Sequence, residues 1–471
     1  MIVGGCAGAI VMWWAAFFAH LPGVRLATGV IAVLTIAALV IGIGAVVRLL
    51  PPGKALVAGL GAGFIAAALN LPALGAGLAT DTSGPIVVGE AAPAEGKPQV
   101  LPEVDDAKAG TSLRPGAVFM ALGFLATGTL AGGIAGAGAR LVSRPRPDDA
   151  RHWLGRMAIV VAGATGLMIV LGGAVTSTES GMAVPDWPTS YGANMFLYPL
   201  SAMAHPRVFF EHTHRLYGSL VGLNVIVLCV MVWAIDRRMW AKIAATVLLG
   251  LVIVQGVLGG LRVSENSLPM AIVHGVLAQV FFGLLVAQAV WLSPAWANMG
   301  ETARLPRVKR AATALVHTMV IQLALGAAAR HLQGVSKGAM HALWTHVAFA
   351  LAVMVLAAMV AGVAQSVAKD DPRRPMLARG GKALLVILVL QVLLGVGALM
   401  AVLHGQRDGG VPDAEAIRSG NAQQVPVVES LLATAHQGNG ALMFGTAMFI
   451  LTWSRRGAKL SSAPEGNSSP A

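Results

Sequence analysis

The stretch EHTHR, residues 211–215, places four ionisable side chains within five positions, directly before twenty uncharged residues. Glu211 and His214 are three positions apart, so on a helix they share one side. A carboxylate beside a pocket can orient water, accept a proton or stabilise positive charge during an oxidation. Glu211 is therefore the candidate catalytic residue. The alternative is a structural ion pair between Glu211 and Arg215, four positions later.

Histidine recurs at a similar depth in three other apolar segments, as His274, His346 and His436. At about 1.5 Å per residue along a helix, His214 would lie roughly 9 Å below the outer membrane surface. Ionisable residues inside membranes are rare and usually functional, so the four histidines predict a binding function. His341, five residues before His346, is an alternative ligand in its segment.

Paired imidazoles from facing helices are a ligand set that haem iron takes, with one imidazole on each axial face. Zinc is a weaker candidate, because no Cys or carboxylate completes a compact tetrahedral set. Glycines recur near the same depth and would leave room for a flat macrocycle, although close helix packing explains them equally well. Two pairs of histidines predict two haem sites.

The surroundings of the two predicted sites differ. The position that matches Glu211 is Leu343 in the segment of His346, so only the first site has an adjacent carboxylate. Arginines near the outer helix ends are candidates for holding haem propionates through charge-assisted hydrogen bonds. Ordinary placement of a long side chain at the interface is the alternative for each of them. These candidates are Arg215, Arg262 and Arg330.

An outer loop with the sequence SGMAVPDWPTSYG, residues 180–192, lies between two of the apolar segments. Two prolines bracket Asp186 and Trp187 in it. Proline restricts the backbone, and an indole favours the membrane interface. The loop is therefore predicted to be a rigid lid, with Asp186 and Trp187 as its candidate functional residues.

The elements that must position these residues are membrane helices. The chain of 471 residues is 56% hydrophobic and 11% charged, and its mean hydropathy is +0.73. Long apolar segments of this kind cross a bilayer as helices. The predicted fold is an all-α integral membrane protein with about twelve spans. They cover approximately residues 2–24, 26–47, 55–80, 115–139, 157–178, 208–235, 243–261, 268–293, 311–329, 340–366, 383–403 and 430–453.

The last eight spans contain an internal repeat of a helix pair, used four times. The first helix of each pair ends in a related phrase, and the returning helix carries the histidine. Three of the phrases have Gln four residues before Gly. Such repeats indicate a pseudo-symmetric bundle with sites at the repeat interfaces. The phrases are MIVLGGAVT (168–176), VQGVLGGLRV (254–263), IQLALGAAAR (321–330) and LQVLLGVGAL (390–399).

The net charge of +12 is explained by its distribution. Alternate connections hold most of the Lys and Arg, as the positive-inside rule describes. This pattern predicts cytoplasmic termini, an inner-membrane location and no role in binding nucleic acid. The two cysteines, Cys6 and Cys229, lie in different apolar segments and offer no disulfide framework.

The basic, proline-containing connection between the fourth and fifth spans divides the chain. Residues 1–140 are predicted to be a four-helix membrane extension, to which the sequence assigns no role. The eight-helix core has two four-helix halves, followed by a cytoplasmic tail. These parts are residues 150–294 with the first haem site, 305–456 with the second, and 457–471.

Several phrases together resemble the heme A synthase family, over about residues 150–456. They are GGAVTSTESGMAVPDWPTSYG, EHTHRLYGSLVG, QGVLGGLRV followed by a histidine, and QLALGAAARH. The family's fold is an eight-helix bundle of two similar halves. Its members oxidise the C8 methyl of heme O to a formyl group and thereby supply heme A to terminal oxidases.

The resemblance implies roles for the residues singled out above. His214 and His274 would flank the substrate, heme O, with Glu211 catalytically important. His346 and His436 would ligate a b-type haem, heme b, that relays electrons. A heme O synthase and an electron acceptor in the membrane are the implied partners.

The chain departs from some members of this family in lacking a Cys pair in an outer loop. It also has Thr176 where mitochondrial-type members have Arg. Two other functions would use the same four histidines. One is a di-haem electron carrier linked to quinol, and the other is a haem transporter or chaperone. Neither of them needs Glu211.

Overall fold

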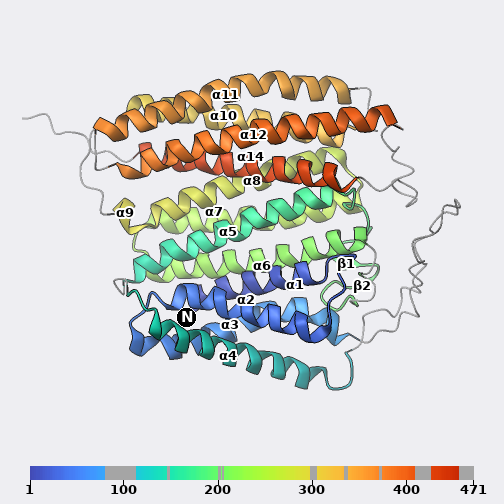
Figure 1. Cartoon of the computed structure of the whole chain (residues 1–471), viewed down its shortest axis with the longest axis vertical. Coiled ribbons are helices and arrows are strands. Elements are labelled where there is room, and N and C mark those ends of the chain that lie inside the picture. The colour runs from blue at the N-terminus through green and yellow to red at the C-terminus, as the bar shows by residue number, and fades with distance from the viewer. Residues whose placement is uncertain are drawn as a thin grey trace, which may run out of the picture.

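A computed structural model describes residues 1–79, 113–145, 149–199, 203, 206–297, 305–333, 338–370, 374–408 and 426–455. Long helices lie side by side and run in the same direction or opposite to it (Figure 1). Eleven helices among the described residues are long and apolar enough to cross a membrane, so the chain is an all-α multi-pass membrane protein. The predicted tail at 457–471 lies outside these residues.

The first four helices pack on one another. Helices α3 and α4 approach very closely, because glycines from both line their contact. A methyl group added at Gly63 would lie 2.1 Å from the carbonyl oxygen of Gly128. Small residues thus let the backbones of these two helices approach each other closely. The helices are α1 (Ile2–Ala19), α2 (Thr28–Val47), α3 (Pro52–Leu78) and α4 (Ala117–Leu141).

The next four helices form a closed ring, in which each helix contacts its two neighbours along the chain and the last contacts the first. The N-terminal helices lean on this ring through α1 and α3. Trp13 and Phe17 of α1 stack on Tyr217 and Phe209, with ring centres 4.4 and 5.3 Å apart. The ring consists of α5 (Ala150–Ser177), α6 (Pro206–Ile235), α7 (Met239–Ser264) and α8 (Leu268–Trp291).

A second ring of four helices repeats this arrangement. Its last helix, α14, is 28 residues long but less apolar than the others, since it includes His436, Gln437 and Asn439. The short helix α9 (Pro294–Ala297) ends the first half. The second ring consists of α10 (Pro306–His331), α11 (Ala339–Asp370), α12 (Pro375–Asp408) and α14 (Val427–Ser454).

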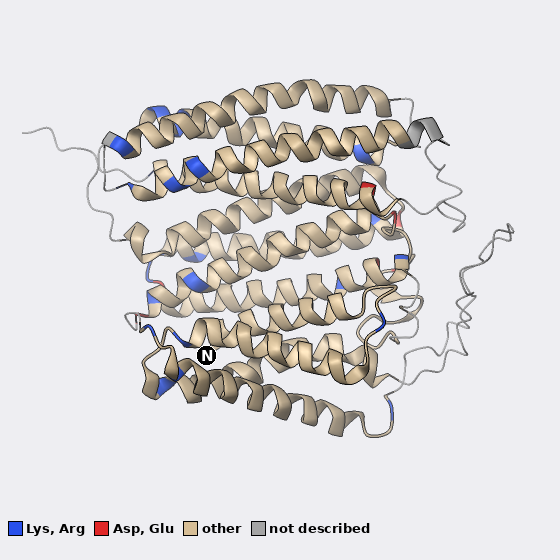
Figure 2. Cartoon of the chain, in the orientation of Figure 1, with Lys and Arg blue, Asp and Glu red and all other residues tan. Residues whose placement is uncertain are grey.

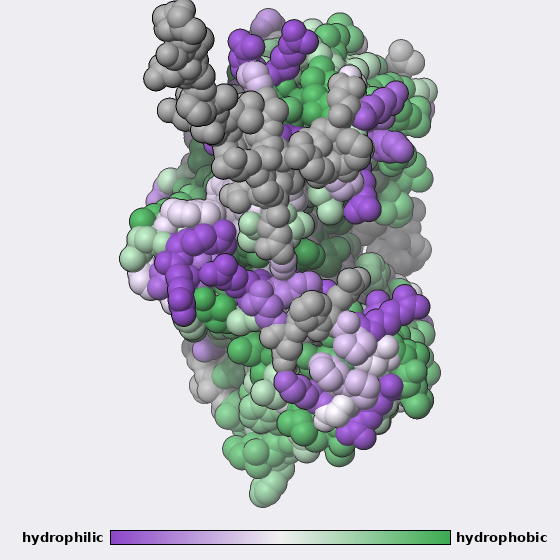
Figure 3. Space-filling view, turned by 90° about the vertical axis from the view of Figure 1, so that its left-hand side faces the viewer, coloured by the Kyte–Doolittle hydropathy of each residue, from purple (hydrophilic) through white to green (hydrophobic). Residues whose placement is uncertain are grey.

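Several helices begin earlier than their apolar segments. Helix α5 begins at Ala150, α10 at Pro306 and α12 at Pro375. The first two turns of these helices carry Arg or Lys. A hydropathy window excludes such charged residues from a predicted span, although they fit into a helix without difficulty. Most Lys and Arg therefore gather at one end of the helices (Figure 2). Hydrophilic patches lie across that end face, with hydrophobic residues at its edges (Figure 3).

The two rings meet through reciprocal notches. Phe282 of α8 lies against Gly445 of α14, and Phe444 of α14 lies against Gly283 of α8. An added methyl group would come within 2.6 and 2.5 Å of the respective phenyl rings. Each half thus contributes a Phe-Gly sequence, and the phenylalanine of one packs against the glycine of the other. This reciprocal contact reflects the pseudo-symmetry of the two halves.

One small hairpin lies at the opposite end from the gathered Lys and Arg (Figures 1 and 2). Strands β1 (Thr189–Ser190) and β2 (Ala193–Asn194) are antiparallel, with Thr189 opposite Asn194 and Ser190 opposite Ala193. The two turn residues, Tyr191 and Gly192, both have positive φ, at 51° and 75°. That conformation suits a two-residue hairpin.

Candidate functional site

Each of the four histidines lies against a glycine of the preceding helix. A methyl group added at the glycine would lie 2.9–3.2 Å from the imidazole, so any larger residue would displace the ring. The recurring glycines therefore accommodate the histidines. The pairs are Gly172 with His214, Gly259 with His274, Gly326 with His346, and Gly395 with His436.

The glutamine four residues before the glycine holds the same histidine. The amide nitrogen of Gln255 donates to the His274 carbonyl oxygen at 3.2 Å, and that of Gln322 donates to the His346 carbonyl oxygen at 3.1 Å. The amide of Gln391 instead lies 3.3 Å from both ring nitrogens of His436. The sequence revealed the Gln-Gly spacing, but not that these amides fix the histidines.

The helix pair of His214 is the exception. Met168 stands where the other three repeats have glutamine. Its methyl group lies at Gly218, where an added Cβ would be 3.1 Å away. The amide that fixes the other histidines is thus missing beside His214.

His346 and His436 come together across the second half, with ring centres 6.3 Å apart and an angle of 81° between the rings. At roughly 2 Å per metal–nitrogen bond, two imidazoles on opposite faces of one metal have ring centres about 6 Å apart. The Gln322 carbonyl oxygen lies 3.2 Å from His346 Nδ1. A hydrogen bond there leaves Nε2 as the ligating atom. This pair fits haem iron.

The two candidate histidines of α11 differ in burial, since His346 is half-buried. His341 is exposed, and its carbonyl oxygen accepts a hydrogen bond from Thr345. The geometry favours His346 over His341 as the histidine that faces His436.

His214 lies at Gly172 of α5 and His274 lies at Gly259 of α7, within the same ring of four helices. His274 Nδ1 and Gln255 Oε1 are buried without a hydrogen-bond partner. Such orphaned polar atoms mark a place where a further group is missing. No group of three or more His, Cys, Asp or Glu that could hold a metal ion occurs in the part of the chain that the structure describes. Paired histidines fit a metal whose other ligands come from a macrocycle.

The carboxylate of Glu211 is engaged on both oxygens. Oε1 accepts from Arg215 Nη2 at 2.8 Å, and Oε2 accepts from the backbone N–H of Val184 at 2.8 Å. The residue is only 3% exposed. The ion pair that sequence offered as an alternative is therefore present, and it includes the loop at 180–192, which we call the strap.

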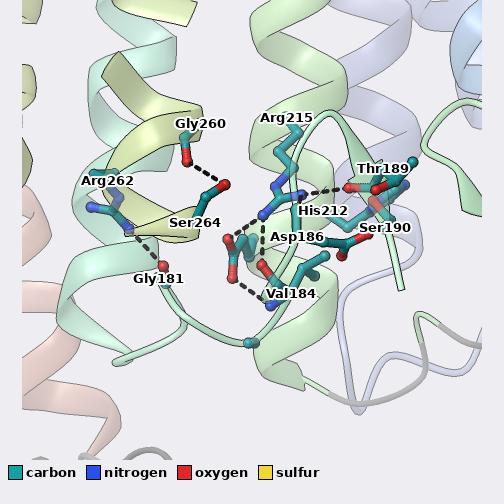
Figure 4. A network of polar contacts seen from close by, with 12 residues as sticks. Gly181, Val184, Asp186, Thr189, Ser190, His212, Arg215, Gly260, Arg262 and Ser264 are labelled. Carbon is teal, nitrogen blue, oxygen red and sulfur yellow. Dashed lines mark hydrogen bonds and ion pairs between the residues drawn. The ribbon is translucent and has the colours of Figure 1, made fainter. Parts of the chain in front are cut away.

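Arg215 donates to the strap as well as to Glu211 (Figure 4). Its Nη2 donates to the Val184 carbonyl oxygen at 2.7 Å, and its Nη1 donates to those of Asp186 and Thr189 at 2.6 and 3.1 Å. One guanidinium thus satisfies three backbone carbonyl groups. Its Nη hydrogens are used up, so Arg215 is poorly placed to hold a propionate.

Asp186 organises the strap from within. Its two carboxylate oxygens accept from the backbone N–H groups of Tyr191 and Gly192 at 2.7 and 2.8 Å. Partial burial acts to raise the pKa of Asp186. Hydrogen bonds from Thr189, Gly192 and Tyr191 outweigh it and hold the pKa below its ordinary value. Asp186 is a structural residue of the hairpin in this geometry.

The strap is also attached to α7. The Trp187 indole lies on Gly260, where an added methyl group would come within 2.2 Å of the ring. Two residues further on, Arg262 Nη2 donates to the Gly181 carbonyl oxygen at 2.7 Å (Figure 4). Gly259, adjacent to Gly260, is the glycine that accommodates His274. Trp187 therefore packs on α7 one residue away in sequence from the glycine that accommodates His274.

Arg330 bridges the halves. Its Nη2 donates to the Thr176 carbonyl oxygen at the end of α5, at 2.7 Å, and its Nη1 donates to Gln333 at 2.9 Å. Nearby, the hydroxyl groups of Ser177 and Thr434 are 2.8 Å apart across the α5–α14 contact. A propionate role for Arg262 and Arg330 stays a prediction.

His212, two positions before His214, serves the strap. Its Nδ1 lies 3.2 Å from the Ser190 hydroxyl group, and its ring lies 4.9 Å from that of Tyr198. EHTHR thus has two functions: His214 faces Gly172 within the ring of helices, while the other ionisable residues face the strap. Sequence spacing alone assigned no role to His212.

Comparison with known proteins shows similarity to one family over part of the chain. The COX15-CtaA family, described as cytochrome oxidase assembly protein, matches residues 155–338. Curated relatives named heme A synthase are similar over parts of the chain. That of Methylobacterium sp. (strain 4-46) is 28% identical over 224 residues, 40% of this chain and 58% of the relative.

Two further heme A synthases show the same level of similarity. That of Bradyrhizobium sp. (strain ORS 278) is 26% identical over 325 residues, 55% of this chain and 86% of the relative. That of Exiguobacterium sibiricum is 26% identical over 170 residues, 35% of this chain and 55% of the relative. The match thus spans little more than half of two of these relatives. Residues 155–338 are thus similar to the cytochrome oxidase assembly protein family, and parts of the chain are similar to these heme A synthases.

Proposed function

We propose that the chain is a heme A synthase, an oxidoreductase that oxidises the C8 methyl of heme O to a formyl group. The observation that carries the proposal is the first histidine pair, His214 and His274, in the half whose outer end carries the strap, which has no counterpart among the described residues of the second half. Both histidines have a glycine that makes room for the ring. The curated relatives of this region are named heme A synthase.

In this proposal, His214 and His274 would ligate the iron of the substrate, heme O. The helices that carry them are apolar, which suits a hydrophobic haem that enters from the lipid. Trp187 covers the outer end beside His274 and restricts the entry of water. Arg262 and Arg330 are the candidates for the propionates, since each has guanidinium hydrogens beyond those used in its described hydrogen bonds.

His346 and His436 would hold heme b as a resident cofactor. When bound, this group supplies one-electron chemistry that the amino-acid side chains lack. The protein's part is to fix both imidazoles, through Gln322 on one side and Gln391 on the other. The Phe-Gly contacts between α8 and α14 hold the two sites in one rigid assembly.

In the proposed topology, the chain spans an inner membrane and both of its termini lie in the cytoplasm. The Lys and Arg at one end of the helices support it, and they lie opposite the strap (Figure 2). The histidine pairs would then open toward the outer leaflet. A heme O synthase would supply the substrate and a membrane electron acceptor would remove electrons. The division at 140–150 separates the N-terminal helices from this machinery.

The test is to express the chain in a host that makes heme O, then extract its haems and separate them with mass detection. Heme A or its hydroxylated precursor, absent from the empty-vector host, is the expected result. His214→Ala is the matched negative variant. Unchanged heme O or heme B alone would contradict the synthase proposal and favour a di-haem electron carrier or a haem transporter.

A further inference from the structure

Glu211 faces the strap in this structure. One oxygen of its carboxylate is bonded to Arg215 and the other to the Val184 N–H, at 2.8 Å each. Both partners are themselves parts of the strap's attachment, because Arg215 donates to three strap carbonyl groups. The carboxylate therefore fixes Arg215, and Arg215 fixes the strap.

The strap needs such an attachment for a physical reason. Carbonyl groups of Val184, Asp186 and Thr189 all turn toward α6, away from any strand partner of their own. A backbone carbonyl group buried without a donor costs free energy. The guanidinium of Arg215 satisfies all three at 2.6–3.1 Å. Without a carboxylate beside it, this buried cation would lack a counter-charge.

A second attachment, to α7, gives the strap its direction. Arg262 holds Gly181, and Gly260 accepts the Trp187 indole. The strap therefore spans from α6 to α7 across the outer end of the first half. Trp187 packs on Gly260 with one part of its ring, while the residue remains 37% exposed. It can therefore make further contacts at the outer end of α7, the helix whose Gly259 accommodates His274.

The second half offers a direct comparison. Leu343 and Val347 stand at the positions of Glu211 and Arg215 relative to the ligand histidine. Neither can form an ion pair. A haem that stays bound needs ligands, and both halves provide paired histidines. A substrate must enter, be enclosed and leave, and closing segments serve that purpose.

We propose that Glu211 is a positioning residue: with Arg215 it fixes the strap, and the strap places Trp187 over the haem held by His214 and His274. This inference rests on the proposed function, since it names the first pair as the substrate site. It replaces the catalytic role that the sequence suggested for Glu211. It also makes Trp187 the residue that encloses the substrate.

Strap opening can be measured without any haem assay. Both native cysteines, Cys6 and Cys229, are buried, so a single Met182→Cys replacement in the full-length protein provides a thiol probe on the strap. Its labelling by a small maleimide is followed in the parent and in Glu211→Ala, Glu211→Gln and Arg215→Lys. Loss of charge-assisted hydrogen bonds is expected to accelerate labelling roughly 10-fold or more in Glu211→Ala and Arg215→Lys.

Glu211→Gln keeps an acceptor for the Val184 N–H and should be intermediate. Asp236→Asn is the matched control, because it removes the ion pair with Arg238 at the opposite end of α6. It should label like the parent. The bis-histidine absorption of the second site reports whether each variant is folded.

Heme A formation is measured in the same variants and in Trp187→Ala. The proposal expects it to fall in parallel with faster labelling. It also expects the Trp187→Ala/Glu211→Ala double variant to be no worse than the poorer single variant, since both act through one device. Labelling like the parent's together with abolished heme A formation in Glu211→Gln would overturn the proposal and return Glu211 to a catalytic role. If the parent makes no heme A, the proposed function fails, while the labelling still decides whether Glu211 fixes the strap.

Discussion

The two halves of the core both place a glycine against each of their histidines, and they differ in the segment that the structure describes at the outer ends of the helices. Glycine notches accommodate the imidazoles in both, and the reciprocal Phe282 and Phe444 contacts relate them across the interface. Among the residues that the structure describes, the strap and the Glu211–Arg215 pair belong to the first half. In the proposed function, the shared contacts serve to bind a haem, and the strap serves the half that acts on one.

The largest expected effect comes from replacing one of the proposed haem-ligating histidines in one half of the core. His214→Ala or His274→Ala should abolish heme A formation and leave the second haem bound. His346→Ala or His436→Ala should lose the bound b-type haem. Haem extraction and absorption spectra of the purified variants measure both. Normal heme A yield from His214→Ala would show that the halves have been assigned the wrong way round.

A smaller effect is expected when the glycine notches are filled. A methyl group at Gly395 would lie 2.9 Å from His436 Cε1, and overpacking of this kind costs about 1–3 kcal/mol. Gly395→Ala should therefore weaken haem retention in the second half by roughly 10-fold. Gly259→Ala, with a contact of 3.1 Å, should act on the first half alone and less strongly.

Gly362→Ala is the control for these variants, since nothing lies within 4 Å of its added methyl group. It should retain haem like the parent. Equal losses in Gly362→Ala and Gly395→Ala would mean that helix flexibility matters, and not the space for the imidazole.

A still smaller effect is expected when the glutamines that contact the histidines are replaced. Gln322→Leu removes the amide that donates to the His346 carbonyl oxygen, a hydrogen bond worth about 0.5–1.5 kcal/mol. Haem release from the second half should become a few-fold faster. Met168→Leu, at the matching position of α5, removes no hydrogen bond and should not change release. Stopped-flow haem transfer to excess apomyoglobin measures both rates.

Much of the fold could be predicted from sequence, because membrane helices follow directly from apolar length. The four-fold repeat and the paired histidines could also be predicted, since Q-x-x-L-G and the later histidine recur with regular spacing. Even the Glu211–Arg215 pair was visible as an i, i+4 alternative. Helix starts such as Ala150 were missed, because charged first turns lie outside an apolar window.

What sequence could not give depends on contacts between distant segments. The hydrogen bonds from Arg215 to strap carbonyl groups depend on the path of residues 180–192 over α6. The contact between Gly260 and Trp187 depends on the strap reaching α7. The same holds for Arg330, whose Thr176 partner lies 154 positions away in another half. Local patterns contain no information on such pairings.

The smallest expected effect concerns pH. The pKa of Asp186 lies below its ordinary value near 3.8, so the ionised carboxylate stabilises the strap. This stabilisation is complete above the ordinary pKa and is lost as pH falls through the lowered one. Labelling of Met182→Cys by an acid-tolerant pyridyl disulfide, corrected for thiolate content, should be constant from neutral pH down to about pH 5. It should rise only below pH 3.8.

Asp186→Asn should label faster at neutral pH and lack this acid rise. A rise near pH 6 in the parent would instead point to a histidine, such as His212 beside Ser190, as the group that controls the strap.

The measurement that tests the account most directly is haem release from the purified protein loaded with two haems. The account predicts two phases of similar amplitude during transfer to excess apomyoglobin. The fast phase should disappear in His214→Ala and the slow phase in His346→Ala, because the first site exchanges substrate and the second retains a cofactor. A single phase, or loss of the fast phase in His346→Ala, would contradict the division of roles between the two halves.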